Sequence, residues 1–153
     1  MKIAEALVLR ADCQKRISQL KKRLEKCAKV QEGEESPEDS IVLLEELKKS
    51  IADLTALVKK INKTNTSTLF DENHSLAETL ADRDAISMER DALDDLIEQS
   101  TIKYDRFSRS EVKFISKINV QDTQKQKDEL SRQFRELDFK IQEKNWTNDL
   151  IED

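Results

Sequence analysis

The segment between residues 103 and 113 holds the densest set of polar side chains that could bind a small anion. Two arginines, two serines and a lysine fall close together here, as Arg106, Ser108, Arg109, Ser110 and Lys113. Guanidinium groups and hydroxyls can hold a phosphate or sulfate through paired hydrogen bonds. The aromatic rings at positions 104 and 107 could stack on a base. We therefore predict that a ligand site, if the protein has one, lies in this segment.

The same arginines have a second possible use, which is to pair with acids on neighbouring helices or subunits while Ser110 caps a turn. Acids outnumber bases in the chain, with 32 Asp and Glu against 27 Lys and Arg, for a net charge of −5. This surplus favours ion pairing, and it predicts no nucleic-acid partner, because a protein that binds phosphate backbones needs a basic surface. No nucleophile and base accompany the cluster, so we expect no enzyme activity.

Few other residues could take part in catalysis or metal binding. His74 is the sole histidine, so histidine-based catalytic triads and zinc sites lack a member. His74 and Glu78 are one helical turn apart and could both face a metal, but a surface contact is the commoner role at a helix start. We predict no metal and no cofactor.

Cys13 and Cys27 are separated by two heptads within one predicted helix. At a rise of about 1.5 Å per residue they lie roughly 21 Å apart, too far for a disulfide with each other. We expect them to fill a helical seam as small apolar side chains, with a redox role as the alternative.

The composition predicts that long helices position all these groups. The chain has one Gly and one Pro among 153 residues, 39% of which are charged. Folds that depend on glycine turns are therefore excluded, and a helical fold is favoured. We predict a mainly α protein with one helical domain over residues 1–153, built as a coiled-coil-like bundle of about four long helices. Two helices form an antiparallel hairpin, and a small two-stranded β element accompanies the bundle.

The first predicted helix, over about 2–30, has a seam in which spacings of three and four residues alternate. Its members are Ile3, Ala6, Arg10, Cys13, Ile17, Leu20, Leu24 and Cys27. The second, from Pro37 to about Ile61, has an equivalent seam of Leu44, Leu47, Ile51, Leu54, Val58 and Ile61. Leu43 and Leu57 widen this second seam. Because its apolar surface is then too wide for one neighbour, we predict self-association that buries Leu43 and Leu57 between subunits.

The third and fourth predicted helices differ in quality. The third runs from Asn73 or Ser75 to about Ile102, and charged residues such as Arg83 and Arg90 interrupt its apolar positions. We expect it to use charged contacts or to be more exposed. The fourth, over about 121–144, recovers a seam that consists of Val120, Thr123, Lys127, Leu130, Phe134, Leu137 and Ile141.

Two features remain at the ends of these helices. Thr66–Phe70 and the alternating segment Val112–Ile118 are predicted to pair as the β element. Trp146 follows the last predicted helix, and we expect it either to pack back on a helix end or to anchor an interface.

Four short motifs support a resemblance to a known family. They are Gln31-Glu-Gly-Glu34, Ile61-Asn-Lys-Thr-Asn65, Arg106-Phe-Ser-Arg-Ser-Glu111 and Asn145-Trp-Thr147. In this order they resemble the septicolysin-like family of small, uncharacterised bacterial helical proteins. The resemblance implies a bacterial source and an all-helical fold. The family name implies a cytolysin that damages membranes.

The sequence favours one function and leaves two alternatives. The longest apolar runs, Ala6–Leu9 and Ile41–Leu44, are far shorter than the about 20 residues of a membrane-spanning helix. The first residues do not resemble a signal peptide, so we expect a cytoplasmic protein without a membrane partner. Our prediction is a non-enzymatic, homo-oligomeric structural or interaction protein. The alternatives are a membrane-active cytolysin and a phosphate-ligand binder that uses the 103–113 cluster.

Overall fold

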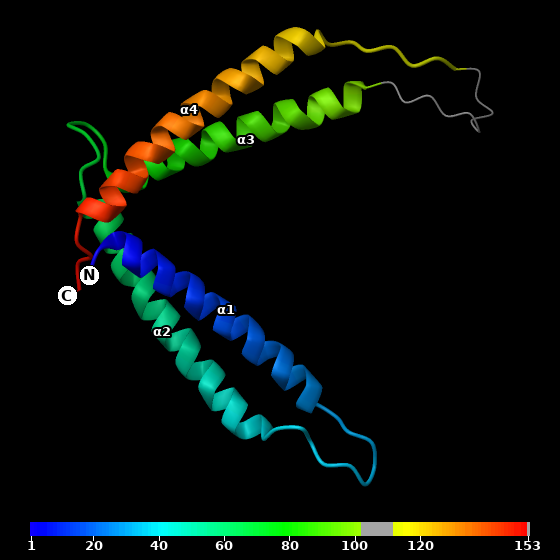
Figure 1. The fold of residues 1–153 in the computed structure, drawn as a ribbon, viewed down its shortest axis with the longest axis vertical. Helices are drawn as coiled ribbons and strands as arrows, with labels where there is room; N and C mark the ends of the chain where they lie inside the picture. Colours follow the sequence, from blue (N-terminus) through cyan, green and yellow to red (C-terminus); the bar gives the residue numbers. More distant parts are fainter. Residues whose placement is uncertain (102–111, 153) are drawn as a thin grey trace. The chain divides into compact units, whose positions relative to one another are not determined.

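The computed structural model describes residues 1–101 and 112–152, and this part of the chain contains four α-helices (Figure 1). They are α1 (Ile3–Cys27), α2 (Ser40–Ser67), α3 (Leu76–Ser100) and α4 (Val120–Thr147). The predicted mainly α class with four long helices is confirmed. The described chain divides into two compact units, Met1–Ala77 with Gln142–Asp153 and Glu78–Ile141, and each is described by itself below. The single domain over 1–153 stays a prediction.

In the first unit, α1 and α2 lie side by side as an antiparallel hairpin (Figure 1). Every predicted seam position of α1 is buried or partly buried, including Arg10 and both free cysteines. Ile3, Ala6 and Leu20 are almost completely enclosed. The alternation of three and four residues therefore identified the face of α1 that packs on its neighbours.

The seam of α2 is shifted from the predicted one at alternate positions. Leu47, Leu54 and Ile61 are covered as expected, but Leu44 and Ile51 remain 44% and 45% exposed. The side chains covered in their place are Leu43 and Ser50, whereas Leu57 and the predicted Val58 are both partly buried. Two apolar stripes lie next to each other on α2, and the packing of α1 decides which of them is buried.

The connection between α1 and α2 uses the residues that interrupt the helical pattern. Gly33 has a φ of 89°, a conformation that side chains disfavour. Helix α2 begins three residues later than predicted, because Asp39 rather than Ser36 is the N-cap and its carboxylate accepts from Ile41 N at 2.9 Å. Arg23 Nε donates to Glu38 Oε2 at 2.9 Å, so an ion pair holds the connection against α1.

In the second unit, charged side chains occupy the seam between α3 and α4. Arg83 Nη1 donates to Asp138 Oδ1 at 2.9 Å, and all but the first of the predicted α4 seam residues are buried or partly buried. The guanidinium carbons of Arg83 and Arg90 lie 5.9 and 4.9 Å from the centre of the Phe134 ring. Lys127 of α4 also pairs with Asp94 of α3. The expectation that the third helix uses charged contacts is confirmed.

The predicted β element was wrong. The described residues contain no strand, and residues 112–117 have no regular structure. Helix α2 extends through Ser67, and the hydroxyls of the β-branched Thr64 and Thr66 donate to the carbonyls of Lys60 and Asn62 at 2.8 and 2.9 Å within it. The loop after α2 contains an isolated bridge between Leu69 and Ser75, with no partner strand.

Candidate interaction surfaces

The predicted anion-binding cluster falls mostly outside the described residues. Arg106, Ser108, Arg109 and Ser110 all lie there, while Lys113 is described and is exposed. Binding of a phosphate ligand by this cluster therefore stays a prediction. In the part of the chain that the structure does describe, no three His, Cys, Asp or Glu side chains are placed to share a metal ion.

His74 makes a local contact at the start of α3. Its Nδ1 lies 3.0 Å from Asp71 Oδ1, and the same carboxylate oxygen accepts from the backbone N–H groups of Asn73 and His74, each at 2.8 Å. The hydrogen bond from Asn73 N, together with the contacts from His74, lowers the pKa of Asp71. These contacts form a turn that leads into α3.

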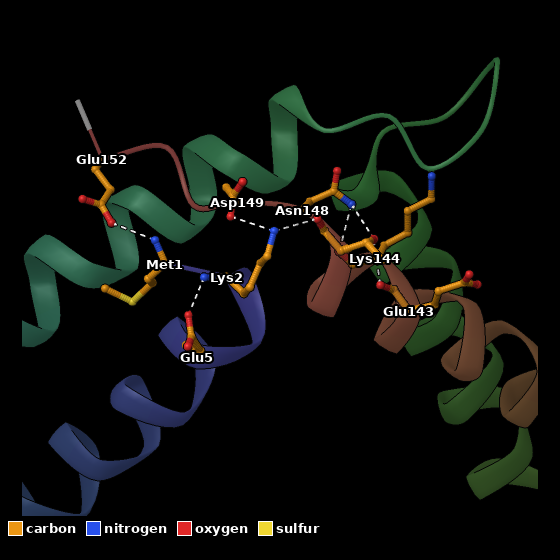
Figure 2. A network of polar contacts seen from close by, with 9 residues as sticks. Met1, Lys2, Glu5, Glu143, Lys144, Asn148, Asp149 and Glu152 are labelled. Carbon is orange, nitrogen blue, oxygen red and sulfur yellow. Dashed lines mark hydrogen bonds and ion pairs between the residues drawn. The ribbon is translucent and has the colours of Figure 1, made fainter.

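A polar network joins the two ends of the chain within the first unit (Figure 2). Lys2 Nζ lies 2.8 Å from Asp149 Oδ1 and donates to the carbonyl of Thr147 at 3.0 Å. This ion pair lowers the pKa of Asp149. The N-terminal amine pairs with Glu152 Oε1 at 3.2 Å.

Backbone hydrogen bonds and an apolar contact reinforce this network. Leu150 N donates to the carbonyl of Met1 at 2.8 Å, and Ile151 N donates to the buried hydroxyl of Thr64 at 2.9 Å. The side chain of Leu150 packs with Ala6 and Ile61 in a buried cluster. The C-terminal segment is therefore fastened to both α1 and α2, and this holds the last turn of α4 beside the start of α1.

The first candidate surface is an apolar hollow at this junction. A shallow space of about 400 Å³ is lined by Met1, Glu5, Val8, Leu9 and Trp146. Trp146 lies in the last turn of α4 and is 60% exposed, and the apolar side chains from α1 are exposed as well. A tryptophan among exposed aliphatic side chains is typical of a contact surface for another protein.

The second candidate surface runs along α2. We call it the outer stripe of α2; its members are Ile41, Leu44, Lys48, Ile51, Thr55 and Val58. All of them are exposed except Val58, which is partly buried. The stripe borders the seam that α1 covers. It therefore leaves aliphatic side chains in solvent, with Lys48 and Thr55 between them.

Of the three predicted interface residues, two are covered within the chain and one is exposed. Leu43 is 3% exposed, and Leu57 packs against the cluster of Ala6, Ile61 and Leu150, so both are covered within one chain. Trp146 is on the surface. Whether any of the three lies between subunits stays a prediction.

Apart from Trp146, sequence reasoning had not selected the residues that make up the two surfaces as contact residues. Val8 and Leu9 belong to an apolar run that was considered only as a membrane segment, although they fall outside the seam of α1. Leu44 and Ile51 had been assigned to the buried seam. An apolar residue outside the covered heptad positions is the signal that could have found them.

Comparison with known proteins identifies the relatives of the chain. The model of DUF6847, a family of unknown function, matches residues 10–150. A solved structure, described as that of a functionally unknown conserved protein from Corynebacterium diphtheriae, is similar over 99% of both chains, with 38% identity and a TM-score of 0.86. No curated protein matches. The resemblance to the septicolysin-like family was therefore wrong: short motifs of three to six residues were too little to identify a family.

Among the described helices, none has the length and apolar character needed to cross a bilayer.

Proposed function

The chain belongs to the DUF6847 family, whose function is unknown, and we propose that it is a non-enzymatic structural protein that assembles with copies of itself through its helices. In this proposal the helical hairpin of α1 and α2 is the element that associates. The protein works by holding subunits together, and it transforms no substrate.

One observation carries the proposal: α2 has two adjacent apolar stripes, and α1 covers one of them. Leu43, Leu54 and Ile61 are turned to the covered side, whereas Leu44 and Ile51 are left on the surface. The aliphatic side chains on such a stripe lose solvent contact when another helix packs on them, at a gain of about 25 cal/mol per Å² of apolar surface buried. A second helix pair would provide that cover.

The apolar hollow around Trp146 supports the proposal in a different way. It provides a further exposed apolar surface on the same unit, next to the first turns of α1. Aromatic residues contribute disproportionately to the binding free energy of protein interfaces. Two apolar surfaces on one small unit favour an assembling protein over an isolated one.

The test is the molar mass in solution, measured by size-exclusion chromatography with light scattering at two protein concentrations and two salt concentrations. We expect a discrete multiple of the 17.8 kDa chain mass that persists at high salt, because the proposed contact is largely apolar. A chain that stays monomeric at tens of micromolar contradicts the proposal.

A further inference from the structure

We propose that the outer stripe of α2 is the contact between two copies of the chain, and that the two α2 helices run antiparallel about a two-fold axis close to Ile51. This inference rests on the self-association proposed above and adds the surface, the partner and the orientation.

The periodicity of the outer stripe points to a helix as the occupant. From Ile41 to Val58 its members follow spacings of three and four residues in strict alternation. This repeat keeps side chains on one line along a helix and is the pattern by which helices pack lengthwise on each other. The covered seam of α2 follows the same repeat one position away, at Leu43, Leu47, Ser50, Leu54, Leu57, Ile61 and Thr64. Helix α2 is therefore built to contact two helices.

The order of residues along the stripe suits a second copy in the reverse direction. With Ile51 of each copy at the axis, Leu44 lies opposite Val58 of the second copy, seven residues to either side of the centre. Lys48, three residues before the centre, and Thr55 of the second copy, four residues after it, come within one residue of each other. The aliphatic side chains thus meet one another, and the lysine lies beside a hydroxyl.

The charges beside the stripe select this direction. Glu45 follows Leu44 and Lys59 follows Val58, so both lie on the same edge of the stripe, and both are exposed. In the antiparallel arrangement Glu45 of each copy lies near Lys59 of the other, which gives two opposite-charge pairs. In a parallel, in-register arrangement the two charges are fourteen residues apart, about 21 Å along the axis, and the complementarity is lost.

Charge reversal tests the contact. We expect Glu45→Lys and Lys59→Glu each to raise the dissociation constant of the full-length protein about tenfold or more, because each places like charges together twice in the dimer. The double variant restores opposite charges and is expected to return to within about threefold of the unchanged protein. Analytical ultracentrifugation over a dilution series measures these constants.

Matched controls separate this contact from a general effect of charge. Glu25→Lys and Lys22→Glu change the net charge by the same amounts on the exposed side of α1, and we expect both to leave association unchanged. Ile51→Gln removes the aliphatic contact at the axis from both copies. We expect it to raise the dissociation constant about tenfold or more, because the apolar surface of both side chains is no longer buried in the dimer. Met88→Gln, an exposed site on α3, is its control. Helical circular dichroism shows that each variant folds.

The outcomes distinguish the two proposals. A monomeric unchanged protein overturns both of them. An oligomer that Glu45→Lys, Lys59→Glu and Ile51→Gln leave intact overturns the assignment of the outer stripe, while the proposed self-association stands. If Trp146→Ala alone dissociates the oligomer, the assignment of the outer stripe is also overturned and the self-association stands, because the hollow is then the interface. Two singly weakened variants and a restored double variant support the antiparallel contact.

Discussion

The two helical hairpins of this protein bury very different side chains. Between α1 and α2 the seam is made of aliphatic residues such as Ile3, Leu20 and Leu43. Between α3 and α4 the equivalent positions include Arg83, Arg90 and Lys127, which pair with carboxylates or lie against an aromatic ring. The two seams nevertheless follow the same heptad spacing.

This difference shows what each kind of seam can do. An aliphatic seam stabilises in proportion to the area it buries and tolerates small changes of register. A partly buried arginine must keep its carboxylate, because a charged group without a partner is costly away from water. The second hairpin therefore depends on individual side chains, whereas the first depends on the total apolar surface.

The largest expected effect tests the aliphatic seam. Ile61 is 1% exposed and packs with Ala6 and Leu150. We expect Ile61→Ala to lower the free energy of unfolding by about 3 kcal/mol, because it removes buried methyl groups and leaves a cavity. Urea titration followed by helical circular dichroism measures the loss. Met88→Ala, at an exposed site, serves as control, and an equal loss in both variants would contradict the central place of Ile61.

The next effect tests the charged seam. Asp138→Ala leaves the partly buried guanidinium of Arg83 without this carboxylate and is expected to cost about 1–2 kcal/mol of unfolding free energy. Asp84 contacts the same arginine at 3.3 Å but is largely exposed, so Asp84→Ala is the matched control, with an expected loss under about 0.5 kcal/mol. Equal losses would mean that burial does not distinguish the two pairs.

A smaller change isolates the aromatic contact. Phe134→Leu keeps an apolar side chain between Arg83 and Arg90 but removes the ring face that attracts their charges. We expect a loss of about 1 kcal/mol. The thermal unfolding midpoint should fall accordingly, and the same substitution in an Arg90→Met background should cost less. An unchanged cost in that background would show that the ring acts through packing alone.

The smallest effect concerns pH at the surface of α4. Hydrogen bonds from Arg132 and Gln133 lower the pKa of Glu129 to about 2, below its ordinary value of 4.5. The ionised carboxylate therefore contributes stability above its unfolded-state pKa, and this contribution is lost as pH falls through the folded value. These two pKa values set the pH interval of the test. Between pH 5 and 2 we expect the free energy of unfolding to fall slightly more for the unchanged protein than for Glu129→Gln. Parallel acid titrations with the same slope would contradict the pairing.

Much of the fold follows from local properties of the chain. The scarcity of Gly and Pro, and the spacing of apolar residues, placed all four helices within about three residues of their observed bounds, except at the end of α2, which extends six residues beyond its predicted bound. The seams of α1 and α4 could be recognised because each of these helices has one dominant stripe. The charged character of α3 was also visible, since Arg83 and Arg90 interrupt its apolar positions.

The candidate surfaces could not be predicted in this way. Periodicity is a property of one helix, and on α2 it describes two neighbouring stripes equally well. Trp146 is exposed in the last turn of α4, and the ion pair of Lys2 and Asp149 near this turn joins residues from opposite ends of the chain. The β element failed for a related reason: strand pairing requires a partner, and local alternation cannot supply one.

The sequence by itself thus determined where helices form and which have a single apolar face, because helix formation depends on neighbours three and four residues away. Only the tertiary structure decided which stripe of α2 is covered, which arginines are paired and where apolar side chains remain in solvent. Those outcomes depend on contacts between distant segments, such as the one between Ile151 and Thr64, and no local pattern encodes them.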